Sequence, residues 1–338
     1  MLCMILVSCT GQKTGKENDN NDKIAIEVGE IKFPPQDVLQ LKSYYLSSSV
    51  HVDSIDYLIG YNYRLHSLDC MNLKSKSVTQ IVLPGDGPDA IVRLSGIYAQ
   101  SLDSVWISDE SERAFLIDSV GTIKRMIDLK KYLEDQEQLL INTNYAMFTS
   151  HLFYNASRHS LMFLVKHTPS NTFIVKEVFI DEVGKMATYQ LSSSKVVPDM
   201  SKGYAYINFP NVNFVGENIV YNYPVESSIY MLDIRTNERK YILADSHYTS
   251  NIIEKCTTSG DYATLEKHWL ENSHFYDIMY LPKYKIYARL HADKVDFDEK
   301  KGMEKLINER DLYLMLFDEN MEKIGETKLS NCRYSPFT

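Results

Sequence analysis

The stretch FLIDSVGTIKRMIDL, residues 115–129, has the pattern of an apolar strand that ends at an aspartate, a short turn with a glycine, and a second strand. An aspartate at the head of such a turn accepts hydrogen bonds from backbone amides further along, which explains its presence without a catalytic role. The pattern recurs in LHSLD ending at Asp69, AFLID at Asp118, EVFID at Asp181, IYMLD at Asp233 and LMLFD at Asp318. Five copies of one pattern indicate five copies of one structural unit.

Each unit has room for four short strands. One strand precedes and another follows every aspartate-ended segment, and a further apolar segment, such as 90–99 or 204–214, lies upstream. Successive aspartates are 49, 63, 52 and 85 residues apart, from positions 69, 118, 181, 233 and 318, which fits β-propeller blades with insertions. Because the strands simply follow one another, a meander is favoured over the Greek-key crossovers of a sandwich. The sequence predicts an all-β fold, a β-propeller of four-stranded antiparallel blades, with helices in the connections at 128–140 and 261–273.

The composition favours β-sheet and disfavours both nucleic-acid binding and a membrane-spanning helix. The chain has 24 tyrosines and 13 phenylalanines against 14 glycines, and aromatic residues favour strands. The net charge of −9 disfavours binding to a nucleic-acid backbone. No apolar run of eighteen residues follows the first ten positions, so the only membrane attachment we expect is a lipid anchor.

The sequence LVSC at residues 6–9 resembles the lipobox of bacterial lipoproteins, and this resemblance implies that Cys9 is acylated and begins the mature chain. A complete signal segment also has a positive region and a longer apolar core, so residues 1–8 are interpreted as a signal remnant. A short buried strand is the alternative. Residues 9–23 are predicted to be a disordered tether, because 11–23 contain no apolar residue. Cys70, Cys256 and Cys332 are too widely spaced for a zinc site, and three free thiols are expected, with one long-range disulfide left open.

The lipobox, the tether, GDGPD at 85–89, the GIY strand that follows it and DSVWISD at 103–109 together resemble a known family. It is the family of six-bladed β-propeller lipoproteins of the Bacteroidota that carry domain of unknown function 4221. The resemblance implies a propeller fold and an envelope location, and carries over no catalytic residue. Members extend beyond the point at which this chain stops, so we expect one propeller domain at 24–338, truncated at its C-terminal end. Six blades with an incomplete last blade are predicted, with seven as the alternative, and 24–33 could supply a strand that closes the ring.

The longest connections are predicted on one face of the propeller. They are 130–145, 191–203, 244–270 and an insertion at 291–310, and long loops on a rigid scaffold commonly carry binding sites. Candidate ligand residues on this face are Trp269, His268, His274 and Asp293, with Trp269 expected at the surface and Trp106 in the core. His268 and His274 share neither a helical nor a strand face, so ordinary loop or core histidines are the simpler interpretation. Asp293 opens an acidic insertion without calcium-loop spacing, and no metal or cofactor is predicted.

Function is less defined than fold. No GxSxG elbow and no Cys–His–Asp set placed by a motif is present, which favours a non-catalytic protein. We expect a lipid-anchored lipoprotein of the cell envelope, at the outer membrane and facing the periplasm or the outside, that binds a protein or glycan through the long-loop face. One alternative is a propeller enzyme acting on a polysaccharide or peptide, whose residues would come from several blades. The other is a scaffold for envelope assembly. The sequence does not define the oligomeric state.

Overall fold

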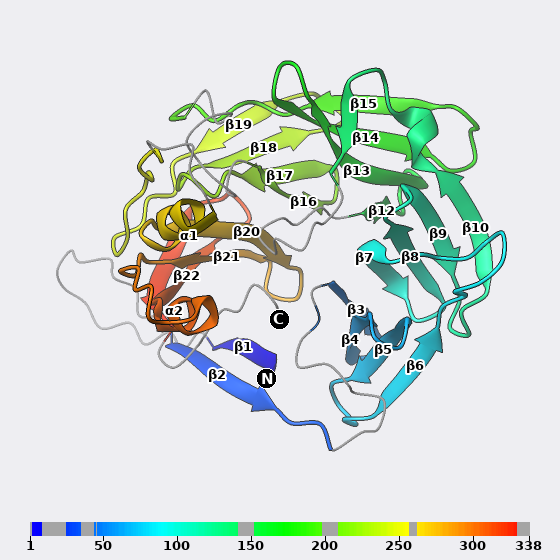
Figure 1. The fold of residues 1–338 in the computed structure, drawn as a ribbon, viewed down its shortest axis with the longest axis horizontal. Helices are drawn as coiled ribbons and strands as arrows, with labels where there is room; N and C mark the ends of the chain where they lie inside the picture. The colour runs from blue at the N-terminus through cyan, green and yellow to red at the C-terminus, as the bar shows by residue number, and fades with distance from the viewer. Residues whose placement is uncertain are drawn as a thin grey trace. The chain divides into compact units, whose positions relative to one another are not determined.

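The computed structural model describes residues 2–8, 25–34, 44, 46–140, 152–197, 209–256 and 262–329. These residues contain five antiparallel sheets with four strand positions each, and one two-stranded sheet (Figure 1). The chain forms two compact units: one is built mainly from residues 32–192, and the other from 193–335 together with 2–31.

The first unit contains three sheets. The first comprises β3 (Ser47–Val52), β4 (Ile55–Asn62), β5 (Ser67–Asn72) and β6 (Val78–Val82), and the second comprises β7 (Leu94–Ser101), β8 (Ser104–Asp109), β9 (Arg113–Ile117) and β10 (Ile123–Asp128). The third contains β13 (Ser160–His167), β14 (Thr172–Phe179) and β15 (Met186–Gln190). Its first position is shared by β11 (Glu137–Leu139) and β12 (Phe153–Asn155), which pair with opposite ends of β13. A 3-10 helix, η1 (Leu129–Tyr132), follows β10.

The second unit contains two four-stranded sheets. They comprise β16 (Asn211–Val215), β17 (Asn218–Asn222), β18 (Ile229–Asp233) and β19 (Arg239–Ile242), followed by β20 (His274–Leu281), β21 (Ile286–Ala292), β22 (Leu312–Phe317) and β23 (Lys323–Lys328). The helix α1 (Tyr262–Leu270) precedes β20, and α2 (Met303–Glu309) lies between β21 and β22. Strands β1 (Leu2–Ser8) and β2 (Ala25–Ile31) pair antiparallel in the two-stranded sheet. In the described parts of the chain, no helix has the length and apolar character needed to cross a membrane.

The all-β propeller of four-stranded antiparallel blades is confirmed, but the predicted blade number is wrong. The structure has five such blades, in place of six with an incomplete last blade or the alternative of seven. The sixth blade was expected from the family resemblance, whereas the five aspartate-ended repeats of the sequence match the five blades observed. Each of the five repeats supplies its own first strand, as β3 does in the first blade, and residues 25–31 pair with β1 in a separate sheet.

The turn role predicted for the repeated aspartates is confirmed at three of the five positions. Asp118, Asp233 and Asp318 each accept two hydrogen bonds from backbone amides within the following four residues. Asp69 instead lies within β5 and is completely buried. In that blade Asn72 has the turn role, because its Oδ1 accepts from the amides of residues 74 and 75. Asp181 pairs with side chains of neighbouring segments, His159 and Arg125.

The long connections differ in part from the predictions. The segment 261–273 contains α1 as predicted, whereas 128–140 contains η1 and β11 rather than an α-helix. The insertion predicted at 291–310 contains α2, whose side chains Leu306 and Ile307 are buried. Trp106 lies in the core of the first unit as predicted, stacked on Tyr154.

Candidate functional site

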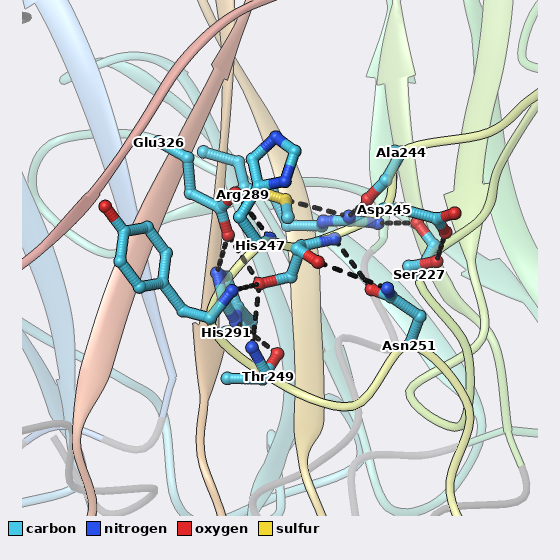
Figure 2. Close-up of polar contacts among 12 residues, drawn as sticks. Ser227, Ala244, Asp245, His247, Thr249, Asn251, Arg289, His291 and Glu326 are labelled. Atoms are coloured by element: carbon cyan, nitrogen blue, oxygen red, sulfur yellow. Dashed lines mark hydrogen bonds and ion pairs between the residues drawn. The ribbon is translucent and has the colours of Figure 1, made fainter. Parts of the chain in front are cut away.

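A polar network joins the chain after β19 to the last strand of the second unit (Figure 2). Residues 244–252 of this connection are called the crossing loop below. The hydroxyl of Ser246 donates to Oε1 of Glu326 in β23 at 2.6 Å, and the backbone amide of His247 donates to Oε2 at 3.1 Å. Lys323 Nζ donates to the carbonyl oxygen of Asp245 at 2.7 Å. One carboxylate and one ammonium group of β23 therefore fix the start of the crossing loop.

Asn251 closes the crossing loop on itself. Its Oδ1 accepts from the amide of Ser246 at 2.6 Å, and its Nδ2 donates to the carbonyl oxygen of the same residue at 3.2 Å. Its own carbonyl oxygen accepts from the amide of Ser227 at 2.9 Å, and the hydroxyl of Ser227 donates to Oδ1 of Asp245 at 2.6 Å. The loop is thus tied both to β23 and to the chain between β17 and β18. These hydrogen bonds fix the conformation of the loop.

Four rings stack one on another, from the strands of the last blade to the crossing loop. Phe275, His291 and Tyr313 lie opposite one another on β20, β21 and β22, with centroid distances of 5.4 and 5.1 Å and interplanar angles of 22° and 16°. Tyr248 of the crossing loop stacks on Tyr313 at 4.9 Å and 20°. His291 is completely buried, whereas Tyr248 is 50% exposed. The stack therefore connects the core of the blade to one ring at the surface.

His291 also joins a chain of groups with acid and base character. Its Nδ1 lies 3.1 Å from the hydroxyl oxygen of Thr249, and its Nε2 lies 2.9 Å from Oε1 of Glu326. Burial lowers the pKa of His291, so the neutral ring is favoured. Burial alone would raise the pKa of Glu326, but His291, the Ser246 hydroxyl and the His247 amide outweigh burial and lower it to about 2.

The order hydroxyl, imidazole, carboxylate resembles that of a catalytic triad, but the group is enclosed. The side chains of His291 and Glu326 are 0% and 2% exposed, and rings stack on His291 from two neighbouring strands. Proton transfer to a substrate requires a candidate base within hydrogen-bond reach of that substrate. In this arrangement His291 and Glu326 hold the crossing loop in place.

Arg289 supports the base of the same loop from inside the blade. Its Nη1 donates to the carbonyl oxygen of Ser227 at 2.5 Å and its Nη2 donates to that of Ala244 at 3.0 Å. The guanidinium lies 4.8 Å from the ring centroid of Phe275. Burial lowers the pKa of Arg289 to about 9, so the group stays charged at neutral pH. A buried cation thus binds the two carbonyl groups that flank the polar network.

The ligand residues predicted from sequence lie in the second unit, and two of them, Trp269 and His274, are in ring contact. Trp269, at the end of α1, is buried, whereas the sequence predicts that it lies at the surface. The indole centroid of Trp269 lies 6.4 Å from the ring centroid of the buried His274. The guanidinium carbon of Arg310 lies 5.5 Å from the same indole centroid. Arg310 Nε donates to the carbonyl oxygen of Asp293 at 2.7 Å. His268 points elsewhere, with Nε2 2.7 Å from the carbonyl oxygen of Glu254, and both histidines are core residues as the simpler interpretation held.

The polar network itself was not predicted from the sequence. Arg289 and His291 carried a signal, because both interrupt the otherwise apolar strand IYARLHA, where a buried charge needs a specific partner. Glu326 and Ser246 carried none, since both lie in segments with ordinary polar composition. In the described part of the chain, no group of three or more His, Cys, Asp or Glu side chains could hold a metal ion.

Comparison with solved structures supports the fold. A crystal structure of a DUF4221 family member from Bacteroides vulgatus ATCC 8482 matches with a TM-score of 0.60 and 15% identity, over 88% of this chain and 84% of that one. A Bacteroides fragilis NCTC 9343 protein, named as a candidate exported protein, matches with a TM-score of 0.54 and 14% identity, over 89% of this chain and 75% of that one. No curated protein matches the chain by sequence.

The family relationship follows from the sequence match. The model of the family called domain of unknown function (DUF4221) matches residues 17–328, which is most of the 338-residue chain. The five blades of the structure lie within that range. The chain therefore belongs to the DUF4221 family.

Proposed function

We propose that this chain is a non-catalytic, lipid-anchored binding protein of the cell envelope, and that the crossing loop is its contact surface for a protein partner. One observation carries the proposal. Tyr248 is 50% exposed, while the groups that hold its loop, Glu326, His291 and Arg289, are buried. The fold thus uses buried polar groups to present a surface ring in a fixed position.

The composition of the crossing loop supports a protein partner. Residues 245–252 read DSHYTSNI, and Tyr with Ser, Thr and Asn is the combination found in protein-binding loops such as antibody paratopes. Tyr contributes a large, stiff, amphipathic surface, and the small polar residues contribute adaptable hydrogen bonds. Ile252 at the end of the loop is 49% exposed and supplies a second apolar contact. An aromatic anchor with a polar surround is typical of energetically important interface positions.

The enclosed His291 and Glu326 weigh against the alternative of an enzyme. With the Thr249 hydroxyl they form the chain of hydroxyl, imidazole and carboxylate described above, and their side chains are 0% and 2% exposed, with rings stacked on His291 from two strands. Nothing in the geometry favours the alternative of an assembly scaffold over a binding protein.

The envelope location rests on two observations. The segment LVSC resembles a lipobox, and a structural relative is named as a candidate exported protein. Cys9 lies outside the described residues, so the lipid anchor is tested chemically. We expect cells that express the full chain with its native leader to incorporate an alkyne-bearing fatty acid into it, and the Cys9→Ala variant to lose the label. Labelling that survives in the variant would contradict the assignment of Cys9.

Tyr248→Ala tests the contact surface, and Tyr284→Ala is its matched control. Tyr284 is 39% exposed and lies in the turn between β20 and β21, at the opposite end of that blade from the β21–β22 connection. We expect Tyr248→Ala, but not Tyr284→Ala, to weaken capture of a partner from envelope extract by about tenfold or more, as loss of an aromatic anchor does. The captured protein must then bind the purified chain directly. Equal capture by the two variants, or binding on a glycan panel in place of any protein, would contradict the proposal.

A further inference from the structure

Arg310 is a buried cation that forms no ion pair with any of the described residues. The residue follows α2 and is 7% exposed. Its Nε donates to the carbonyl oxygen of Asp293, and its Nη2 donates to that of Asn272, both at 2.7 Å. Its Nη1 is buried and has no hydrogen-bond partner among the residues that the structure describes. Of the described residues, none places a carboxylate oxygen within 4.0 Å of this guanidinium, and the charge of Asp293 acts on it from beyond that distance. A buried charge without a close partner is strongly unfavourable.

Two further groups with unused hydrogen-bonding capacity lie beside Arg310. The indole Nε1 of Trp269 and both ring nitrogens of His274 are buried, and none of these three atoms has a hydrogen-bond partner within the described parts of the chain. The two ring centroids are 6.4 Å apart in an edge-to-face arrangement, and the guanidinium carbon lies 5.5 Å from the indole centroid. Burial, together with the charge of Arg310, lowers the pKa of His274 well below its ordinary value. The ring is therefore neutral and can donate one N–H.

The three side chains thus leave donors in excess inside one small region. Arg310 Nη1, Trp269 Nε1 and one nitrogen of His274 are donors, and the other nitrogen of His274 is the single acceptor. The three side chains together carry the charge of one guanidinium, and no carboxylate of the described residues lies within ion-pair distance of it. A neutral ligand would satisfy hydrogen bonds but would leave this charge unpaired, whereas a singly charged anion satisfies both.

We propose that Arg310, Trp269 and His274 form an internal binding site for a small monovalent anion, of the size of a halide ion or of the carboxylate group of formate or acetate. In this proposal the unused guanidinium and indole N–H groups donate to the anion, and the guanidinium balances its charge. The site is separate from the crossing loop, and its existence does not depend on the proposed function.

Tryptophan fluorescence tests the proposal on the full-length chain. The chain has two tryptophans, and Trp106 belongs to the other compact unit, so a change on titration can be assigned by comparison with Trp269→Phe. We expect sodium bromide, chloride, formate or acetate to change the fluorescence of the wild type saturably and to raise its Tm. We expect Trp269→Phe to lose the fluorescence change, and His274→Phe to weaken binding by about tenfold, since each loses a hydrogen-bonding group.

Comparing the halides with formate and acetate shows whether the site binds a free ion or the carboxylate group of a larger ligand. Saturation by halides alone identifies a free-ion site, and saturation by formate and acetate identifies a site for the carboxylate of a larger ligand. Unchanged fluorescence and Tm in the wild type with all four salts would overturn the proposal. Equal apparent affinity in wild type and His274→Phe would also overturn it. If His274→Phe fails to fold, the wild-type titration and Trp269→Phe still decide the outcome.

Discussion

The carboxylate of Glu326 lies 2.9 Å from Nε2 of His291, and both side chains are buried in the last blade. The same carboxylate accepts hydrogen bonds from the hydroxyl of Ser246 and the amide of His247, about 80 residues earlier in the chain. One buried residue therefore fixes the inner ring of the aromatic stack and the loop that carries the outer ring. The position of Tyr248 at the surface depends on this connection.

Replacing Glu326 by Gln should loosen the crossing loop. The amide cannot pair with His291 and accept both loop hydrogen bonds as a carboxylate does, and we expect a loss of about 2–4 kcal/mol in the free energy of unfolding. Hydrogen exchange at the His247 amide should also become faster. The matched control is Glu322→Gln, because Glu322 is exposed at the turn before the same strand. Equal stability and equal exchange in the two variants would show that Glu326 does not hold the loop.

Acid should destabilise the folded chain from about pH 6.5 downward. Burial lowers the pKa of His291 and of His274, so the unfolded chain binds protons first below the ordinary histidine value of about 6.5. The fold lowers the pKa of Glu326 from 4.5 to about 2. Protonating this carboxylate therefore removes further free energy of unfolding as the pH falls from about 4.5 toward 2. Urea unfolding across this range should show a falling free energy of unfolding. His274→Phe should flatten the decline between about pH 6.5 and 5, and an unchanged slope would contradict the role of this histidine.

The two kinds of repeated aspartate should differ in their effect on stability. Asp69 is buried and accepts hydrogen bonds from Tyr44, Asn62 and Gln80 at 2.7, 2.9 and 2.7 Å. Asp69→Ala leaves these donors without an acceptor, and we expect a loss of about 3–4 kcal/mol. Asp233→Ala removes two turn hydrogen bonds and an ion pair with the exposed Arg235, and should cost about 1 kcal/mol. Chemical unfolding of both variants measures the difference, and similar losses would argue against the buried role of Asp69.

Alanine substitutions at two glycines in equivalent turns distinguish the cost of backbone strain from the cost of steric overlap. Gly121 and Gly184 have φ values of +86° and +80°, where a side chain is strained. A Cβ at Gly121 would also overlap the carbonyl oxygen of Val82, whereas a Cβ at Gly184 would meet nothing within 4 Å. We expect Gly184→Ala to lower the free energy of unfolding by about 1 kcal/mol and Gly121→Ala by about 3 kcal/mol or more. If urea unfolding shows the same loss of free energy of unfolding for both variants, Gly121 does not pack closely against Val82.

The repeating features of the fold could be predicted from the sequence, because local composition encodes them. Strand segments and the turns after Asp118, Asp233 and Asp318 follow from apolar runs and turn chemistry. The blade number was wrong because it followed the family resemblance, although the sequence contains five aspartate-ended repeats. The pairing of 25–31 with 2–8 has no local signature. Trp269 was misplaced because its position in a long connection suggested exposure, whereas the last turn of α1 is buried.

The candidate site depends on contacts between distant residues, which the sequence does not encode locally. Glu326, His291 and Ser246 come from three separate segments and meet only in the folded chain. A charged residue within an apolar strand was the one available signal, and it pointed to Arg289. Buried charge is rare without a partner, so this signal could have directed attention to β21 before the structure was known.

Site-specific photocrosslinking at position 248 is the most direct test of the crossing loop as a contact surface. A benzoylphenylalanine replacing Tyr248 is compared with one replacing Tyr284, in the full-length chain and in envelope extract. The proposed function predicts that position 248 yields a discrete crosslinked protein band and position 284 does not. The same bands from both positions, or a band from position 284 alone, would contradict it.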